Sequence, residues 1–298
     1  MSLHSFPFDA LGTECVLHLH AESAATAENT AVAASDEVNR IEMRYSRYRE
    51  DSMLALINRA AARGDSIDVD AETAALLGYA LAAHRMSHGL FDITSGILRR
   101  AWHFESGQLP MASDVAALLP YIGMDKLEWN SPRLGFRISG MELDFGGIGK
   151  EYAADRAADL CYANGITRGL VDLGGDIRVL GPHPDGSPWR IGIRDPSNPA
   201  TACTIVTLFT GALATSGDYE RYIDDGGRRY CHILDPHTGW PSHGLRSVSV
   251  SAETCLLAGS LTTVAMLMGD RGKDWLSGQG VDHLWIDEAG NGGGPLRA

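Results

Sequence analysis

The stretch from Leu213 to Pro241 predicts a β-hairpin, and with it a fold that contains antiparallel strands. An apolar run ends at Thr215-Ser216-Gly217, and the turn residues Asp224-Asp225-Gly226-Gly227 separate it from an alternating segment from Tyr230 to Leu234. Asp and Gly tolerate the positive φ angles that tight hairpin turns require, so the chain reverses here. Antiparallel pairing follows from this reversal.

The same hairpin brings together side chains that can do chemistry. Two hydroxyls and a permissive glycine at 215–217 can direct donors at one anion. The returning segment carries His232, and Asp235-Pro236 ends it. Histidine is the usual proton carrier near neutral pH, which favours a catalytic site. An ordinary loop with a structural histidine is the more common explanation of such a pattern, so the hairpin alone does not establish a catalytic site.

Composition and charge restrict the possible functions. The chain has 298 residues, of which 44% are hydrophobic and 21% are charged, as in a soluble globular protein. We expect a single domain over 1–298, with a smaller subdomain around 90–140 and a flexible Gly-rich tail at 290–298. The net charge of −13 and the lack of a Lys/Arg run argue against a nucleic-acid partner.

Targeting signals and cysteine usage predict a cytoplasmic protein. The first residues contain no basic segment followed by an apolar one, and no stretch is long and apolar enough to insert into a membrane. The cysteines are odd in number and form no C-x-x-C pair, which indicates a reducing compartment. They are Cys15, Cys161, Cys203, Cys231 and Cys255.

Hydrophobic periodicity predicts an α+β fold, with antiparallel sheets and long helices packed on them. The expected strands outnumber the expected helices, and several are joined as hairpins. Helices are expected at 21–45, 52–58, 71–87, 112–119, 152–164 and 254–268, with a short one from 273. Strands are expected at 12–20, 127–129, 134–138, 142–145, 169–173, 176–180, 189–194, 203–209, 212–215, 245–251 and 281–286.

Two glycine turns are candidates for anion binding. Residues 144–150 (D-F-G-G-I-G-K) run from an expected strand through glycines into a helix, whose free N–H groups and lysine suit a phosphate. Residues 172–176 (D-L-G-G-D) form a second glycine turn, with flanking carboxylates, between two expected strands. Neither is a Rossmann or P-loop motif, and close packing or a plain β-turn explains each one as well.

Six motifs in order give the chain a recognisable resemblance. They are Y-R-E-D-S at 48–52, G-L-F-D-I-T at 89–94, D-F-G-G-I-G-K-E-Y-A-A-D at 144–155, D-L-G-G-D-I at 172–177, T-S-G-D-Y-E-R-Y at 215–222 and H-I-L-D-P-H-T-G-W-P at 232–241. Together they resemble the ApbE-type flavin transferases, which are FAD:protein FMN transferases. The likeness runs from Leu11 to the helix around Thr263 and implies an ApbE-like, T-fold-related architecture.

The resemblance also implies an activity and a set of site residues. It implies transfer of the FMN half of FAD onto a Thr or Ser hydroxyl of a partner protein, with magnesium, forming a phosphoester and releasing AMP. His232 matches the functional histidine and is the candidate base, with Asp235 beside it to orient it. The remaining matched positions surround the dinucleotide. They are Leu11 and Tyr48 near the flavin, Asp92 and Thr94 lining the cleft, and Lys150, Asp155, Gly174, Gly175, Thr215, Ser216 and Gly217.

The sequence departs from the family pattern where the metal is expected. The family helix usually reads D-A-L-x-T, and its Asp and Thr hold magnesium with a carbonyl from the glycine–lysine loop. Here Gly149 and Thr263 are in place, but Gly259 stands where the carboxylate is expected, and Lys150-Glu151 replaces the usual Lys-Gly. Magnesium favours carboxylate oxygen, so we expect weak binding and slow or absent transfer, unless another carboxylate such as Asp218 serves.

This departure keeps other functions open. The protein can be an FAD-binding protein with reduced or lost transferase activity, an FAD pyrophosphatase giving FMN and AMP, or an enzyme for another flavin-like or nucleotide substrate. A zinc hydrolase built on His232, His237 and His243 is disfavoured, because their spacing spans a turn and no helical zinc motif accompanies them. The sequence does not identify the acceptor protein.

Overall fold

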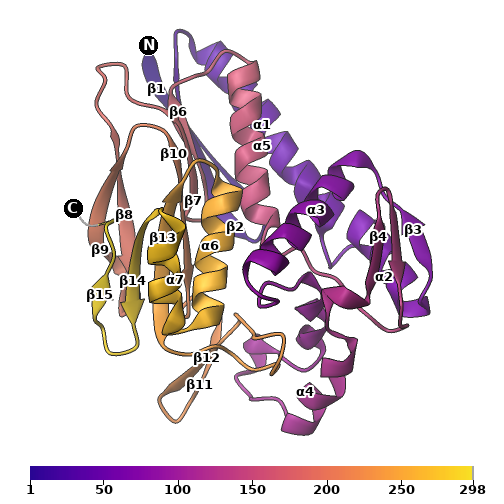
Figure 1. The fold of residues 1–298 in the computed structure, drawn as a ribbon. Coiled ribbons are helices and arrows are strands. Elements are labelled where there is room, and N and C mark those ends of the chain that lie inside the picture. Colours follow the sequence, from indigo (N-terminus) through magenta and orange to yellow (C-terminus); the bar gives the residue numbers. More distant parts are fainter. Residues whose placement is uncertain (297–298) are drawn as a thin grey trace.

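The computed structural model describes residues 1–296 and confirms the α+β class, with helices packed on an antiparallel sheet (Figure 1). The main sheet has eight strands in the order β1-β2-β6-β7-β10-β13-β14-β15. Its strands are β1 (Ser2–Ala10), β2 (Thr13–Ala21), β6 (Gly169–Leu173), β7 (Asp176–Gly181), β10 (Gly211–Gly217), β13 (Leu245–Ala252), β14 (Asp282–Asp287) and β15 (Gly292–Gly293). The helices are α1 (Ala24–Tyr45), α2 (Met53–Arg63), α3 (Ala71–Met86), α4 (Ala112–Leu118), α5 (Gly149–Ala163), α6 (Cys255–Met268) and α7 (Arg271–Gln279).

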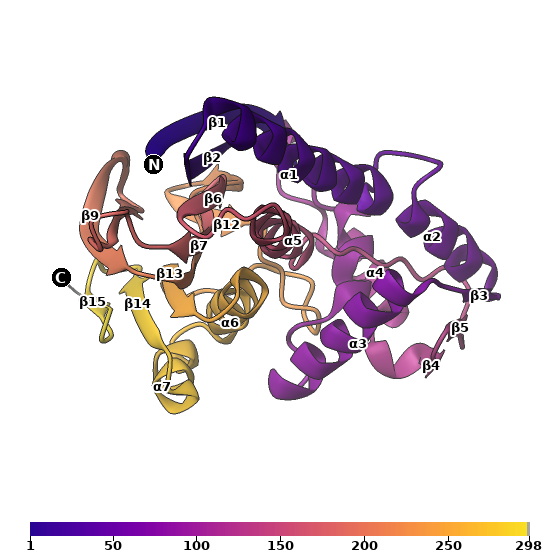
Figure 2. The same ribbon diagram turned by 90° about the horizontal axis from the view of Figure 1, so that it is seen from above.

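Both faces of the main sheet are covered. Helix α6 packs on β10 and β13, and α5 packs beside it on β6 and β7. Figure 2 shows this helix pair between the sheet and α3. The opposite face is covered by the β8 (Trp189–Asp195) and β9 (Asn198–Leu208) hairpin, whose buried residues cluster with Leu170, Ile177 and Val179. Burial on both faces explains why β6 reads as a nearly continuous apolar run.

Helices α2, α3 and α4 and a small sheet form a smaller lobe on the other side of α5 and α6 (Figure 2), whereas α1 packs on β1 and β2, and α7 packs on α6. A three-stranded sheet has the order β3-β5-β4, from β3 (Ser66–Asp68), β4 (Leu127–Asn130) and β5 (Arg133–Phe136). A satellite core gathers Ile97, Leu98, Trp102, Val115 and Ile122 with Ile223 of the hairpin β11 (Tyr222–Asp225) and β12 (Arg228–Cys231). The short 3₁₀ segments are η1 (Ile93–Arg100), η2 (Phe104–Ser106), η3 (Leu119–Tyr121) and η4 (Met124–Lys126).

Local signals placed several boundaries correctly. Ser52 begins α2 by accepting a hydrogen bond from Ala55 N–H at 2.9 Å, although the helix continues beyond residue 58 to Arg63. The turn at Gly226-Gly227 forms as expected, with φ angles of 61° and 84°, but it joins β11 to β12 in a separate two-stranded sheet. The expected hairpin between the strand ending at Gly217 and the returning strand is wrong, because β10 pairs with β7 and β13 instead. No helix within residues 1–296 has both the length and the apolar character needed to cross a membrane.

Four other expectations were wrong or incomplete. The pattern missed β1, an edge strand that tolerates Pro7 because edge strands leave N–H positions unused. No strand forms at 142–145, because the Asn58 side chain bonds both backbone groups of Leu143. The returning hairpin strand ends at Cys231, one residue before His232.

The C-terminal tail is the fourth case. Gly292–Gly293 pairs with β14, and Leu296 is buried with its N–H bonded to His283 C=O at 3.0 Å. These contacts dock the part of the tail up to residue 296 on the sheet, where we expected it to be flexible. Residues 297–298 lie outside the described residues.

Candidate active site

The first glycine turn leads directly into the N-terminus of α5. The Asp144 carboxylate organises it, because Oδ1 accepts Gly146 N–H at 2.7 Å while Oδ2 accepts Arg47 Nη1 at 2.7 Å. Arg47 in turn donates to the hydroxyl of Tyr48 at 2.9 Å and lies over its ring. A guanidinium that sequence reasoning did not select is thus fixed beside the turn.

The second glycine turn lies between β6 and β7 and packs on the β1–β2 turn. Gly174 has a φ of 67°, and a β-carbon there would meet Thr13 Oγ1 at 2.4 Å, so only glycine allows this approach. Gly175 N–H donates to Asp172 Oδ1 at 2.7 Å. Asp176, the next residue, holds Lys150 Nζ of α5 at 2.7 Å. This ion pair joins the two glycine turns.

Lys150 keeps its charge in this position. Burial works to lower its pKa, but the carboxylates of Asp176 and Glu151 outweigh burial and raise the pKa above its ordinary value. The side chain remains partly exposed. The site therefore offers a permanent cation next to the free N–H groups of a helix start, an arrangement that suits an anion.

His232 lies just after β12 and is half-buried. Burial and the positive charges of Arg221, Lys150 and Arg47 lower its pKa to about 4, so the ring is neutral near pH 7. Lys150 and Arg47, whose charges act on this ring, are the cations held at the first glycine turn. Its Nδ1 is 3.3 Å from the carbonyl of Arg221, which can only accept. The proton therefore sits on Nδ1, and Nε2 has a lone pair to accept another.

Asp235 has different partners from the one expected. Its Oδ1 accepts the N–H of His237 at 2.8 Å and lies 3.3 Å from the Nδ1 of the same residue. The His232 ring instead forms its hydrogen bond with the Arg221 carbonyl. Asp235 thus stabilises the turn at residues 235–237. Any effect of Asp235 on His232 is therefore indirect, through the conformation of this turn.

The hydroxyls at the end of β10 face the neighbouring strand and helix α6. Thr215 Oγ1 is 2.7 Å from Ser249 Oγ, and Ser216 Oγ is 2.8 Å from Thr262 Oγ1 and 3.4 Å from Thr263 Oγ1. Gly217 follows them and is buried. Ser216 and Thr263 are therefore brought together, although they are distant in the sequence.

Three other predicted residues are engaged inside the protein. Asp92 accepts from Thr94 N–H at 2.8 Å and from Met124 N–H at 3.1 Å, and Thr94 is fully buried. Asp155 accepts the N–H groups of Cys255 and Leu256, both at 2.9 Å, and so fixes the start of α6 to α5. Their observed contacts are structural, and contact with a ligand stays a prediction for each.

Leu11 and Tyr48 lie at the edge of the site. Leu11 occupies the β1–β2 turn with a φ of 56°, and Tyr48 is 81% exposed. A depression of about 470 Å³ includes Gly12 and Thr13, next to Leu11. A second, of about 380 Å³, includes Asp235 and His237. Both depressions thus share residues with the segments that build the site.

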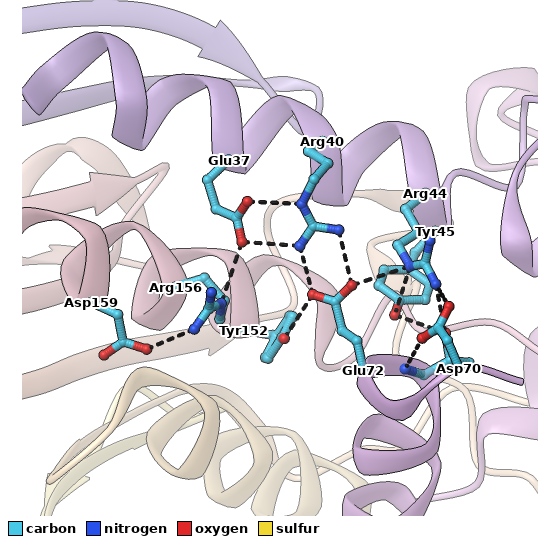
Figure 3. Close-up of polar contacts among 10 residues, drawn as sticks. Glu37, Arg40, Arg44, Tyr45, Asp70, Glu72, Tyr152, Arg156 and Asp159 are labelled. Carbon is cyan, nitrogen blue, oxygen red and sulfur yellow. Dashed lines mark hydrogen bonds and ion pairs between the residues drawn. The ribbon is translucent and has the colours of Figure 1, made fainter. Parts of the chain in front are cut away.

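The polar side of α5 is tied to α1 and α3 by a charge network (Figure 3). Glu72 accepts from Arg40 Nη2 at 2.6 Å, from Arg44 Nε at 3.2 Å and from the Tyr152 hydroxyl at 2.9 Å. Arg156 reaches Glu37 at 3.3 Å on the same side. These contacts fix the helix whose first turn carries Lys150.

Within residues 1–296, no three His, Cys, Asp or Glu side chains gather in a metal-binding arrangement. Asp218 is buried and paired with Arg229 at 3.2 Å, which leaves it poorly suited to a cation. Glu151 is different. It is buried against Gly259, and its Oε2 has no hydrogen-bond partner. Burial, followed by the charge of Asp176, raises its pKa.

Sequence reasoning missed Arg47 and the role of Glu151. Arg47 stands inside the S-R-Y-R segment, next to Tyr48, but no periodicity marks it as a site residue. Glu151 was visible as a departure from a family pattern, and Gly259 as another, but only the structure shows that the two residues touch.

The chain is similar to known proteins over most of its length. Residues 11–285 match the model of the ApbE family. A Treponema pallidum protein named FAD:protein FMN transferase is 32% identical over 304 residues, covering 93% of this chain and 82% of that protein. A Vibrio cholerae protein of the same name is 32% identical over 231 residues, covering 76% and 69%.

Solved structures agree with these sequence matches. The ApbE protein of Thermotoga maritima has a TM-score of 0.89 at 31% identity, covering 98% of this chain and 97% of that one. The flavin transferase ApbE of Vibrio cholerae has a TM-score of 0.86 at 27% identity, covering 98% and 96%.

Proposed function

The chain belongs to the ApbE family, and from this we propose that it transfers the FMN part of FAD to a hydroxyl group of an acceptor protein. The observation that carries the proposal is a neutral His232 that feels the positive charges of Lys150 and Arg47, the two cations fixed at the first glycine turn. The relatives' name, FAD:protein FMN transferase, supports the same reaction. The acceptor is a protein with an accessible Thr or Ser, and we propose a cytoplasmic location for the reaction.

The pyrophosphate of FAD fits the charge arrangement of the site. The protein as a whole is strongly acidic, with a net charge of −13, so an anionic substrate needs a local positive region. Lys150, Arg47 and the N–H groups at the start of α5 supply it. A β-carbon at Gly175 would have nothing within 4 Å, so this corner of the second glycine turn leaves room for the phosphates.

The flavin ring has an exposed aromatic surface available to it. Tyr48 projects into solvent, and the Arg47 guanidinium lies 5.0 Å from its ring centroid. Planar ligands stack well on an aromatic ring that an arginine holds in place. We propose that Tyr48 and the Leu11 turn contact the flavin end, as the resemblance implies.

His232 is the proposed general base. The acceptor hydroxyl gives its proton to Nε2, and its oxygen forms a bond with the phosphorus of the FMN half. The bond between that phosphorus and the bridging pyrophosphate oxygen breaks, and the electron pair leaves with AMP. The products are a phosphoester-linked flavoprotein, AMP and a protonated His232, which returns its proton to solvent.

Magnesium is the proposed metal, and the residues fit it. When bound, it would neutralise phosphate charge that otherwise resists attack by the hydroxyl oxygen. Gly149 can offer a backbone carbonyl and Thr263 a hydroxyl, as hard oxygen ligands. The fit is supported by the unpartnered carboxylate oxygen of Glu151, which lies against Gly259.

One assay separates the candidate functions. The protein is incubated with FAD, magnesium and a candidate acceptor protein, and the products are separated. AMP with a fluorescent acceptor adduct supports the transferase. AMP with free FMN supports FAD hydrolysis, the alternative that the missing carboxylate at Gly259 keeps open. Intact, protein-bound FAD supports a binding protein and contradicts both reactions.

A further inference from the structure

Glu151 and Gly259 form one packing unit across the α5–α6 contact. A β-carbon added at Gly259 would lie 2.5 Å from Cγ of Glu151 and 2.6 Å from its Oε1. The Glu151 side chain therefore occupies the space that any side chain at residue 259 would need. The carboxylate has moved to the facing helix, and the glycine opposite makes room for it.

The unpartnered oxygen is costly for the folded protein. Glu151 is 8% exposed, and its Oε2 is buried without a hydrogen-bond partner. A buried carboxylate without donors is destabilising, so natural proteins pair such groups or use them to coordinate metals. The nearest cation does not pair with it, because Lys150 Nζ contacts Asp176 Oδ2 at 2.7 Å instead.

Other buried carboxylates in the described residues have hydrogen-bond or ion-pair partners. Glu142 is 4% exposed and contacts both Arg99 and Arg100. Asp92 is 8% exposed and accepts the N–H groups of Thr94 and Met124. Glu151 Oε2 is the one carboxylate oxygen among the buried side-chain atoms that lack partners within residues 1–296. Its lack of donors is therefore a local property and not a general feature of the interior.

Further oxygen ligands lie on the same two helices. Thr263 is four residues after Gly259, so both occupy one face of α6. Its Oγ1 is also 3.4 Å from Ser216 Oγ of β10. Gly149 is in the first turn of α5, two residues before Glu151. A carboxylate, hydroxyls and a carbonyl are the ligand types that hard divalent cations prefer.

We propose that Glu151, whose side chain fills the space beside Gly259, is the anionic ligand of a divalent cation, magnesium, at the α5–α6 contact. Thr263 and the Gly149 carbonyl complete the protein's share of the ligands. The inference deepens the proposed function, because the metal lies where the pyrophosphate of FAD would be bound. It replaces the expectation, drawn from Gly259 alone, that the protein has lost its anionic ligand.

The test measures metal binding without using transfer activity. Mn²⁺ is titrated into the full-length protein, alone and with FAD, and free Mn²⁺ is followed by electron paramagnetic resonance. We expect Glu151→Gln to weaken Mn²⁺ binding about tenfold or more, since the lost ligand carries the charge. Glu142→Gln is the matched control, because it changes another buried carboxylate that arginines already pair. It should leave the affinity unchanged.

A relocated carboxylate distinguishes ligation from a packing effect. Glu151→Gly combined with Gly259→Asp returns the carboxylate to α6, and we expect it to recover most of the Mn²⁺ affinity. Unchanged binding in Glu151→Gln overturns the proposal. So does a loss in Glu151→Gln that the double variant does not recover, since that result assigns the loss to packing.

A measurement on the wild type covers the case in which the variants do not fold. Crystals of the wild-type protein soaked in Mn²⁺ should give an anomalous peak at the Glu151 carboxylate. A peak elsewhere, or none at this carboxylate, contradicts the proposal. A peak at Glu151 in a protein that transfers no FMN supports the metal site and rejects the proposed function, so the two failures are separate.

Discussion

Helix α5 has one carboxylate in contact with its polar side and another on the side that faces α6. On the polar side, Glu72 of α3 accepts from Arg40, Arg44 and the Tyr152 hydroxyl, as Figure 3 shows. Hydrogen bonding to Arg40 is the main reason that its pKa is lowered. On the α6 side, Glu151 has an unpartnered Oε2, and burial raises its pKa.

The difference separates a structural region from a reactive one. Glu72 has used its acceptor capacity on the protein, so it contributes to the attachment of α5 and has little left for a ligand. Glu151 and His232 keep free lone pairs at the cost of folding stability. Binding sites commonly retain such groups, and the stability that they cost is supplied elsewhere in the fold.

The strongest test of this contrast removes the base from the reactive region. His232→Asn should slow flavin transfer by roughly 10²–10⁴-fold, the usual contribution of a general base, without changing the midpoint of urea unfolding. His237→Asn, at a largely exposed position nearby, is the matched control and should keep its rate. Wild-type transfer in His232→Asn would remove His232 from the mechanism.

A measurement of the pKa of His232 is a second test of the difference between the two regions. Its imidazole signals in NMR, identified by their loss in His232→Asn, should titrate near pH 4, because burial and the positive charges of Arg221, Lys150 and Arg47 disfavour the protonated ring. A midpoint at or above 6.5 would contradict the described environment.

The lowered pKa of His232 also determines how the stability of the protein changes with pH. The folded-state pKa lies below the ordinary value of 6.5, so on acidification the unfolded chain takes up this proton first. The contribution of His232 to stability is thus fully present above pH 6.5 and declines as the pH falls toward 4. Subtracting the urea-unfolding free energies of His232→Asn from those of the wild type, at each pH, should show this decline.

A smaller effect is expected from filling the space beside Glu151. Gly259→Ala places a β-carbon 2.5 Å from Glu151 Cγ, and overpacking of this kind costs about 1–3 kcal/mol. In a Glu151→Ala background the same change should be neutral or stabilising by about 1 kcal/mol, as helix propensity predicts. Gly278→Ala in α7 is the control, because nothing lies within 4 Å of the new β-carbon. Equal effects of Gly259→Ala in both backgrounds would show that the residues are not coupled.

The smallest effect is expected in the polar network. Tyr152→Phe removes one hydrogen bond to Glu72 and should cost about 0.5–1.5 kcal/mol in urea unfolding, with the transfer rate unchanged. Glu72→Ala combined with Tyr152→Phe should cost less than the sum of the single changes, since both remove the same bond. A large loss of transfer in Tyr152→Phe would mean that this side of α5 also serves the reaction.

Local patterns predicted much of the fold. Apolar spacing and capping residues located α1, α3 and α6, and the Gly-rich turn between 224 and 227 located the β11–β12 hairpin. Edge strand β1 and the Asn58 side chain, which replaces a strand at Leu143, could not be predicted in this way. The Asn58 contact joins residues 85 positions apart. Strand β1 pairs with the adjacent β2, but its Pro7 is atypical of a strand, so the pattern did not mark it.

By itself, the sequence determined the α+β class, the glycine turns and the family motifs around His232, because these follow from spacing and residue type along the chain. Only the tertiary structure decided which carboxylates are free. Asp155 and Asp218 are engaged by α6 and by Arg229, whereas Glu151 meets Gly259 and keeps a free oxygen. The physical reason is that hydrogen-bond satisfaction depends on contacts that no local pattern records, and for Asp155 and Glu151 these contacts cross between helices to residues about 100 positions away in the chain.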